Sequence, residues 1–289
     1  MAQMAIPLNP IGASRTRAMW VPREHGAWGL LLVPLVTGAG AVSGIANYGV
    51  LTWFALAAIA LFWLRTPVES LVGTSIIRAR TVEERRTALN AVVIVGVIAS
   101  LALIALFWNF QHLALALIGA IAGLAFLAQA ILKKRARKYR AIAQIVGSVG
   151  LASTAASAYY LRSGSLSLTA LLLWIVNWLF AAEQIEFVQL RIQGAKLETP
   201  TERVVRGKAY ITTLSFVLII IVSGSVVHLL PALTFVAFIP SLLRSSIWLT
   251  SSRKPLDVHK LGWLELTNAV LFAVLLITAF RVGSTGRPF

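Results

Sequence analysis

The chain has 289 residues, of which 58% are hydrophobic and 12% are charged. This balance excludes an ordinary soluble domain and indicates a protein embedded in a lipid bilayer. The net charge of +16 does not indicate nucleic-acid binding, because the basic residues lie in short segments beside apolar runs, and the lack of cysteine excludes disulfides and cysteine-bound metals.

Nine apolar runs have the length of membrane helices, and they do not alternate polar with apolar residues as barrel strands do. In chain order they cover residues 25–45, 48–65, 88–108, 113–132, 141–161, 166–183, 209–227, 231–248 and 261–280. We therefore predict an all-α fold, a polytopic bundle of about nine transmembrane helices in a single domain over residues 23–289. Residues 1–22 have no continuous apolar core, so we expect a cytoplasmic tail rather than a cleavable signal peptide.

The basic residues give this predicted bundle an orientation. With the N-terminus in the cytoplasm, 23 of the 26 Lys and Arg residues lie on the cytoplasmic side, and only Arg162, Arg281 and Arg287 lie outside. The positive-inside rule then places the C-terminus outside the cell. The expected partner of the basic segments is the anionic cytoplasmic leaflet of the bilayer.

Two cytoplasmic segments, 66–87 and 184–208, are long and polar and are expected to form caps over the bundle. Each contains a capping-box pattern, Thr81 with Glu84 and Thr199 with Glu202, which predicts that a helix begins there. The external connections are short, so the helices that they join should be antiparallel neighbours.

Three carboxylates at the cytoplasmic ends of the spans suggest a metal site. Glu69 follows the second span, and Glu183 and Glu186 share one helix face at the end of the sixth. Carboxylate oxygens are suitable ligands for Mg²⁺, which would bridge to substrate phosphates. The alternative is that these are ordinary interfacial helix ends that pair with nearby arginines; Arg65 can pair with Glu69 if the second span stays helical past Pro67.

The basic residues near the same membrane face could bind a phosphate group. The candidates are Lys134 and Arg135 in the run after the fourth span, together with Arg65 and Arg191. The alternative for the basic run is that its side chains extend to the interface, as Lys and Arg commonly do at membrane helix ends.

The start of the first span combines several kinds of chemistry. Glu24 and His25 could form an acid/base or ligand pair in a cytoplasmic cavity, or they could simply begin an anchored helix. In the last span Glu265 and Asn268 share a face, which indicates hydrogen bonding inside the bundle. The middle of the bundle is otherwise apolar apart from Gln144 and Asn177, which argues against ion-coupled transport.

Residues 22–29 (PREHGAWG), followed by Pro34 and Gly38, resemble the opening of the YwiC-like family of bacterial membrane proteins. Residues 65–67 and 183–191 are also similar to that family. The resemblance implies a multi-pass protein of the bacterial plasma (inner) membrane, and it implies little about chemistry.

The overall layout, with long cytoplasmic loops after the second and sixth spans and a basic cluster after the fourth, resembles UbiA-type prenyltransferases. That resemblance implies a Mg²⁺-dependent transferase acting on an isoprenoid or other lipid-soluble diphosphate. The aspartate-rich motifs of those enzymes are missing, since the only aspartate of the chain is Asp257. The alternative function is non-enzymatic, either a small-solute transporter or an assembly factor for a membrane complex.

Overall fold

A computed structural model describes residues 25–44, 48–73, 78–109, 113–135, 140–197, 199–251 and 256–285. Within these ranges the regular structure is helical throughout. Eight helices are long and apolar enough to cross a membrane, and the apolar helix over residues 28–41 is shorter. The predicted polytopic bundle of membrane-length helices is therefore confirmed. The chain divides into two compact units, residues 1–25 with 48–111, and residues 26–47 with 112–289.

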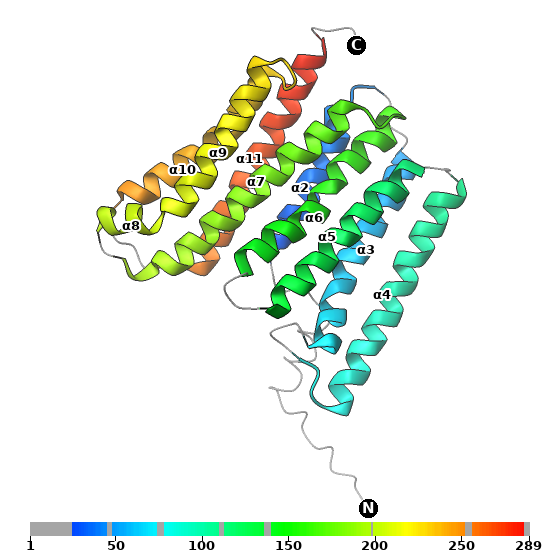
Figure 1. Cartoon of the computed structure of the whole chain (residues 1–289). Helices are drawn as coiled ribbons and strands as arrows, with labels where there is room; N and C mark the ends of the chain where they lie inside the picture. Colours follow the sequence, from blue (N-terminus) through cyan, green and yellow to red (C-terminus); the bar gives the residue numbers. More distant parts are fainter. Residues whose placement is uncertain are drawn as a thin grey trace, which may run out of the picture. The chain divides into compact units, whose positions relative to one another are not determined.

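The first unit contains α3 (Tyr48–Val72) and α4 (Val82–Asn109), which pack against each other along their length (Figure 1). Small residues at the contact, Ala60 on α3 and Ala99 on α4, are buried beside Val95. Small side chains allow two membrane helices to approach closely, which is the usual way that such helices pack in lipid.

Both helices of the first unit extend into the segment 66–87 that was expected to be a loop. α3 continues through Pro67 to Val72, and Arg65 Nε donates to Glu69 Oε1 at 2.9 Å, as expected for a helix that stays regular there. At the start of α4, Glu84 N donates to Thr81 Oγ1 at 3.1 Å and Thr81 N donates to Glu84 Oε2 at 3.2 Å. The predicted capping box is confirmed, and it marks the start of α4 six residues before the predicted third span.

The described part of the second unit is made of α-helices and short 3₁₀-helices, and Figure 1 labels its α-helices. In chain order they are α2 (His25–Ala41), α5 (Leu113–Arg135), α6 (Arg140–Ser163), α7 (Leu168–Gln193), η2 (Gly194–Lys196), α8 (Pro200–Arg206), α9 (Lys208–Val226), η3 (Ala232–Phe238), α10 (Ile239–Thr250) and α11 (Val258–Thr285). α5 packs on α6, α6 on α7 and α7 on α9, while η3 contacts α9 and α11, and α10 contacts α11.

α2 lies against α6 at a very close backbone approach. A Cβ added at Gly38 would collide with the backbone of Ala155, so only glycine allows this spacing. Beside it, Thr154 Oγ1 donates to the Leu31 carbonyl at 3.1 Å, and Thr37 Oγ1 donates to Asn177 Oδ1 at 3.1 Å. The small polar residues of α6 therefore act in packing and in hydrogen bonds between helices.

Two arginines that the sequence places on the external side satisfy carbonyl groups near the C-terminal end of α2. Arg162 donates to the carbonyls of Ala39 at 2.8 Å and Gly44 at 2.6 Å. Arg281 donates to the carbonyl of Gly40 at 2.7 Å. A cation at a helix C-terminus interacts favourably with the helix dipole and supplies donors to carbonyls that lack helical partners. These contacts bring the C-terminal ends of α2, α6 and α11 together. The predicted topology requires this, because it places the ends of these three helices on the same side of the membrane.

α7 continues ten residues beyond residue 183, where the predicted sixth span ended. It runs to Gln193 because Glu183 and Gln184 are buried and hydrogen bonded inside the bundle, so these polar residues do not end the helix. The expected loop 184–208 is accordingly reduced, and it holds η2 and α8. The capping box predicted at Thr199 and Glu202 is confirmed at the start of α8.

The predicted eighth span is not one regular helix. It begins as the 3₁₀-helix η3 and becomes α-helical at Ile239, with Pro240 in the first turn of α10. Proline lacks an N–H and fits the first turn of an α-helix, so it favours a new helix at this point. The change of helix type lies inside the apolar stretch Ala232–Thr250, which has the length of a membrane span.

Asp257 caps the start of α11 outside the membrane span. Its Oδ1 accepts the backbone N–H of Lys260 at 3.1 Å and of His259 at 3.0 Å. The hydrogen bond from the Lys260 N–H is the main cause that lowers the pKa of this carboxyl below its ordinary value. The single aspartate of the chain is therefore a helix cap.

Candidate functional site

A network of ionic and hydrogen-bonding side chains lies between α7, α9, α10 and α11. Arg244 Nη2 donates to Glu183 Oε1 at 2.5 Å, and Arg244 Nη1 donates to Glu265 Oε2. Tyr210 donates its hydroxyl to Glu183 Oε1 at 2.7 Å, and Ser241 donates to Glu183 Oε2 at 3.1 Å. Together with Asn268, we call these residues the ion-pair network.

The ion-pair network is buried and carries two carboxylates for one directly bound guanidinium. Glu183 is 0% exposed and Glu265 is 6% exposed, and Arg244 makes an ion pair with each of them. The directly bonded set therefore has a net charge of −1. Charge in a buried membrane environment is costly unless it is paired, so a residual charge at this place requires an explanation.

Two acceptors of the ion-pair network have no donor within the described part of the chain. They are Glu265 Oε1 and Asn268 Oδ1, three residues apart on one face of α11. Asn268 Nδ2 donates to Ser241 Oγ at 3.1 Å, so only the amide oxygen of Asn268 is left over. A buried acceptor without a donor costs free energy, and one added proton on Glu265 would supply the missing donor.

Glu183 lies inside the length of α7, whereas Tyr210 is the third residue of α9 and Glu265 is the eighth residue of α11. Glu183 is ten residues from the end of α7 at Gln193, which at 1.5 Å per residue is about 15 Å along the helix. It is fifteen residues, roughly 22 Å, from the other end at Leu168. The helix continues ten residues beyond the predicted end of this span, while the position of this carboxylate at the membrane rim stays a prediction.

Three phenylalanines close the network on the side that the sequence predicts to be external. Phe180 of α7 and Phe272 of α11 stack at a centroid distance of 3.8 Å, and Phe238 of η3 meets Phe272 edge-on at 5.4 Å. Each lies three or four residues from a network residue on the same stretch of chain. These rings are part of the main apolar core and separate the charges from that end of the bundle.

Arginines and aromatic rings alternate on the opposite side of the network, which the sequence predicts to be cytoplasmic. The Arg244 guanidinium carbon lies 4.0 Å from the centre of the Phe187 ring. The Arg191 guanidinium lies 5.9 Å from Phe187 and 5.8 Å from Trp248, and Arg203 lies 5.5 Å from Trp248. Cations within about 6 Å of a ring face are attracted by its electrons, so this stack stabilises the positions of the three guanidinium groups.

The residues predicted for phosphate, metal and acid/base roles are distributed over the whole chain. Arg65 and Glu69 are joined by their ion pair within the first unit. Glu24 lies outside the described residues, and His25 begins α2 with a side chain that also lies outside them. The acid/base role of these two residues stays a prediction.

The remaining predicted residues belong to the second unit. Lys134 and Arg135 are exposed in the last turn of α5. Glu186 is half-buried on α7 and has no hydrogen bond or ion pair to any residue that the structure describes, whereas Glu183 is the centre of the ion-pair network. Arg191 is half-buried in the last turn of the same helix. The two glutamates thus share a helix but not an environment.

The surroundings of Glu183 do not fit a divalent metal. Both of its oxygens already accept hydrogen bonds, from Tyr210, Ser241 and Arg244. A metal ion bound there would have to displace the Arg244 guanidinium, which already neutralises part of the carboxylate charge. Among the described residues, no three His, Asp or Glu side chains gather as a metal site needs. The carboxylate oxygens of Glu183 are therefore suited to bind an arginine side chain or a proton rather than Mg²⁺.

Sequence reasoning missed Arg244 as a site residue and counted it only as a cytoplasmic positive charge. Its position inside the apolar run 231–248 was the available signal, because an arginine within a span needs a partner. Tyr210 and Ser241 gave no such signal, since they lie 27 and 58 residues from Glu183 in the chain. Only the packing of α9 and α10 against α7 brings them together.

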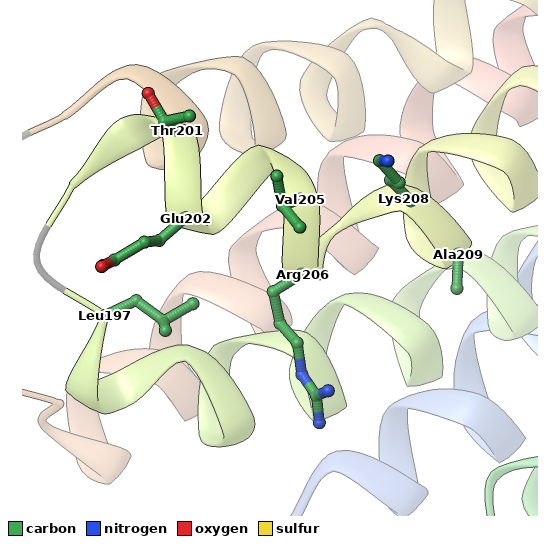
Figure 2. A pocket seen from close by; sticks show the side chains of 7 residues that line it. All are labelled: Leu197, Thr201, Glu202, Val205, Arg206, Lys208 and Ala209. Carbon is green, nitrogen blue, oxygen red and sulfur yellow. The ribbon is translucent and has the colours of Figure 1, made fainter.

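A separate open groove of about 620 Å³ lies beside α8, as Figure 2 shows. Arg206 forms part of its wall and donates to Gln193 Oε1 at 2.7 Å. The groove combines apolar surface with one carboxylate and two cations, and it includes no residue of the ion-pair network. Its lining residues are Leu197, Thr201, Glu202, Val205, Arg206, Lys208 and Ala209.

Comparison with known proteins gives a family but no activity. Residues 21–159 match the family described as YwiC-like protein. No curated protein matches the chain. The matched region runs from the start of α2 into α6 and ends before the ion-pair network, so the family match says nothing of that network. Residues 21–159 of this helical membrane protein are thus similar to the YwiC-like family.

Proposed function

We propose that this chain is a secondary transporter of the bacterial plasma (inner) membrane, in which the movement of a small solute is coupled to protonation of Glu265. A proton from cytoplasmic water would bind Glu265 Oε1 and convert the carboxylate to a carboxylic acid. The net charge of the directly bonded network would change from −1 to 0, and the new O–H could donate to the unpartnered Asn268 Oδ1. Titratable residues buried within membrane spans mark ion and proton pathways in many transporters.

The single observation that carries this proposal is the buried, unpartnered Glu265 oxygen beside a second buried carboxylate. The net charge around Glu265 depends on four ionisable side chains nearby. They are Glu183 and Arg191 on α7, Tyr210 on α9 and Arg244 on α10. Three donors bind the two oxygens of Glu183. Glu265 accepts from Arg244 through Oε2 while its Oε1 has no donor among the described residues, so Oε1 is the oxygen at which an added proton would make a new hydrogen bond.

The broken eighth span supports transport independently. Transporters often bind solutes and coupling ions where a membrane helix is interrupted. Here the change from η3 to α10 occurs at residues 238–239, and Ser241 and Arg244 of the ion-pair network follow within two turns. The apolar middle of the bundle had argued against ion coupling, but this argument weakens because the ion-pair network supplies buried ionisable groups inside the bundle.

A proton-flux measurement tests this function. Purified protein in liposomes that contain a pH-sensitive dye is exposed to inward gradients of phosphate, succinate, citrate or glutamate, and acidification of the lumen is recorded. Wild-type protein should acidify the lumen with at least one of these solutes. Glu265→Gln should lower that rate at least tenfold, because its amide cannot carry the proton, whereas Glu83→Gln, at an exposed carboxylate of α4, should not change it.

Folded wild-type protein that moves no protons with any of these solutes would contradict transport. Unchanged flux in the Glu265→Gln variant would contradict the role of Glu265. A matching thermal unfolding midpoint for wild-type protein and both variants ensures that differences in rate do not reflect loss of the fold.

A metal-dependent transfer from a lipid-soluble diphosphate, the other function that the sequence suggested, has less support. It needs Glu183 and Glu186 as joint metal ligands with Glu69. Glu183 is held by Arg244, Ser241 and Tyr210. An oxygen ligand for Mg²⁺ needs a free lone pair directed at the metal, and the Glu183 oxygens are already occupied.

The exposed cations at the cytoplasmic end of the second unit support an association with anionic lipids. Lys134 and Arg135 at the end of α5 and Arg206 and Lys208 around the groove of Figure 2 are all exposed. Each basic residue near an anionic membrane surface contributes about 1 kcal/mol of attraction at most, so together they help to keep this end at the cytoplasmic leaflet.

A further inference from the structure

Arg191 is a half-buried arginine of the second unit that has no acceptor among the described residues, unlike the other arginines that pack within this unit. Arg244 binds two carboxylates, and Arg162 and Arg281 bind carbonyls near the end of α2. Two more have acceptors as well: Arg203 donates to the carbonyls of Trp248, Ser251 and Leu197, and Arg206 donates to Gln193. For Arg191 the described residues supply neither a hydrogen bond nor an ion pair.

The position of the Arg191 guanidinium is nevertheless fixed. Its side chain is half-buried, and it lies near the faces of Phe187 and Trp248 at 5.9 and 5.8 Å. Contact with aromatic rings holds a guanidinium through its flat face and leaves the N–H groups at its edge available. A partly desolvated cation with free N–H groups is a suitable donor for an oxyanion, which it can bind through two parallel hydrogen bonds.

The ring that supports Arg191 is itself tightly held. Arg203 also lies over Trp248, at 5.5 Å, and donates to its carbonyl at 3.2 Å. A Cβ added at Gly194 would come within 3.0 Å of the Trp248 ring, so the end of α7 packs directly on this indole. The aromatic support of Arg191 is therefore part of the packed structure and does not depend on a ligand.

Arg191 lies on the cytoplasmic approach to the ion-pair network. Glu183, Phe187 and Arg191 follow one another at intervals of four residues, on one face of α7. The charge of Arg191 interacts with those of Glu265, Arg244 and Arg203. An anion bound to Arg191 would thus be close enough to influence the charge state of Glu265.

From this geometry we propose that Arg191 binds the oxyanion group, carboxylate or phosphate, of the transported solute, an inference that rests on the function proposed above. An anion at Arg191 adds negative charge near Glu265 and so favours its protonation. By linkage, a proton on Glu265 strengthens anion binding by the same factor. Solute and proton would then move together, which makes the protein a proton–anion cotransporter.

Anion binding can be measured without transport. The unfolding midpoint of the purified protein is recorded with increasing inorganic phosphate or succinate at constant ionic strength, with chloride as the balancing salt. Wild-type protein should be stabilised by one of these anions. Arg191→Gln should weaken the binding roughly tenfold or more, and Arg206→Gln, which removes an exposed guanidinium at the nearby groove, should bind as wild type does.

The pH dependence separates a binding role from a structural one. Wild-type protein should bind the anion more tightly at lower pH, and Glu265→Gln should abolish that dependence while it keeps the anion site. Binding that is lost in Arg191→Gln and insensitive to pH would overturn the coupling but keep the anion site. Normal binding in Arg191→Gln would overturn the site itself, whatever the proton-flux result for Glu265.

A phospholipid headgroup presents the same oxyanion chemistry, and a second arm distinguishes it from a soluble solute. The unfolding midpoint is compared in lipid nanodiscs that contain phosphatidylglycerol and in nanodiscs of phosphatidylcholine alone. Stabilisation by phosphatidylglycerol that requires Arg191, with none by phosphate or succinate, would overturn the assignment to a transported solute. Stabilisation by the soluble anions in both kinds of nanodisc is the expected result.

Discussion

Replacing Arg244 with methionine should destabilise the second unit by about 3–5 kcal/mol, because it leaves Glu183 and Glu265 buried without their shared counter-charge. The guanidinium is only 11% exposed, so water cannot replace it easily. The free energy of unfolding is measured in detergent, by thermal unfolding or by denaturant titration. Arg206→Met, at an exposed arginine outside the network, should change this free energy by less than 1 kcal/mol.

A combined variant tests whether charge imbalance is the cause. Arg244→Met together with Glu183→Gln and Glu265→Gln removes all three charges, and it should recover most of the lost stability, since an uncharged replacement of a buried ion pair is often close to neutral. If Arg244→Met alone costs less than 1 kcal/mol, or the combined variant is no more stable than the single one, the ion-pair network does not have the energetic role assigned here.

The second large effect is expected where α2 meets α6. Gly38→Ala places a methyl group where the backbone of Ala155 already lies, and the nearby hydrogen bond from Thr154 to Leu31 would be disturbed as the helices separate. Overpacking of this kind costs about 1–3 kcal/mol, and a contact with backbone cannot relax as a side chain can, so the loss should be near the upper end.

Gly29 provides a matched control on the same helix. A Cβ at Gly29 has no atom within 4 Å among the described residues, so Gly29→Ala should be neutral or stabilising by up to about 1 kcal/mol. The comparison uses the unfolding midpoint of each variant in one detergent. Equal midpoints for the two alanine variants would show that the close approach of α2 and α6 does not stabilise the protein.

The sequence predicted what depends on local pattern. Apolar runs marked the spans, and the pairs Thr81–Glu84 and Thr199–Glu202 marked helix starts because a capping box needs only four consecutive residues. The ion pair of Arg65 with Glu69 followed from a spacing of four residues on a helix. Each of these contacts is made within a single stretch of chain, where spacing alone determines which residues meet.

The ion-pair network could be predicted only in part. The shared face of Glu265 and Asn268 followed from helical spacing. The link from Glu183 to Arg244 spans 61 residues, and it depends on how α7, α10 and α11 pack. The end of the sixth helix was placed too early, because hydropathy treats a carboxylate as the end of a span, whereas hydrogen bonds from Tyr210 and Ser241 allow the helix to continue beyond Glu183.

Infrared spectroscopy of the purified protein in lipid tests the proton on Glu265 most directly, through the carbonyl stretch of a protonated carboxylic acid. Wild-type protein should show this band in the acidic range and lose it as the pH is raised. The Glu265→Gln variant should lack the band, and the Glu83→Gln variant should keep it. If the band is absent from wild-type protein at every pH at which the protein is folded, or if it persists in Glu265→Gln, then Glu265 does not carry the proton and the account fails.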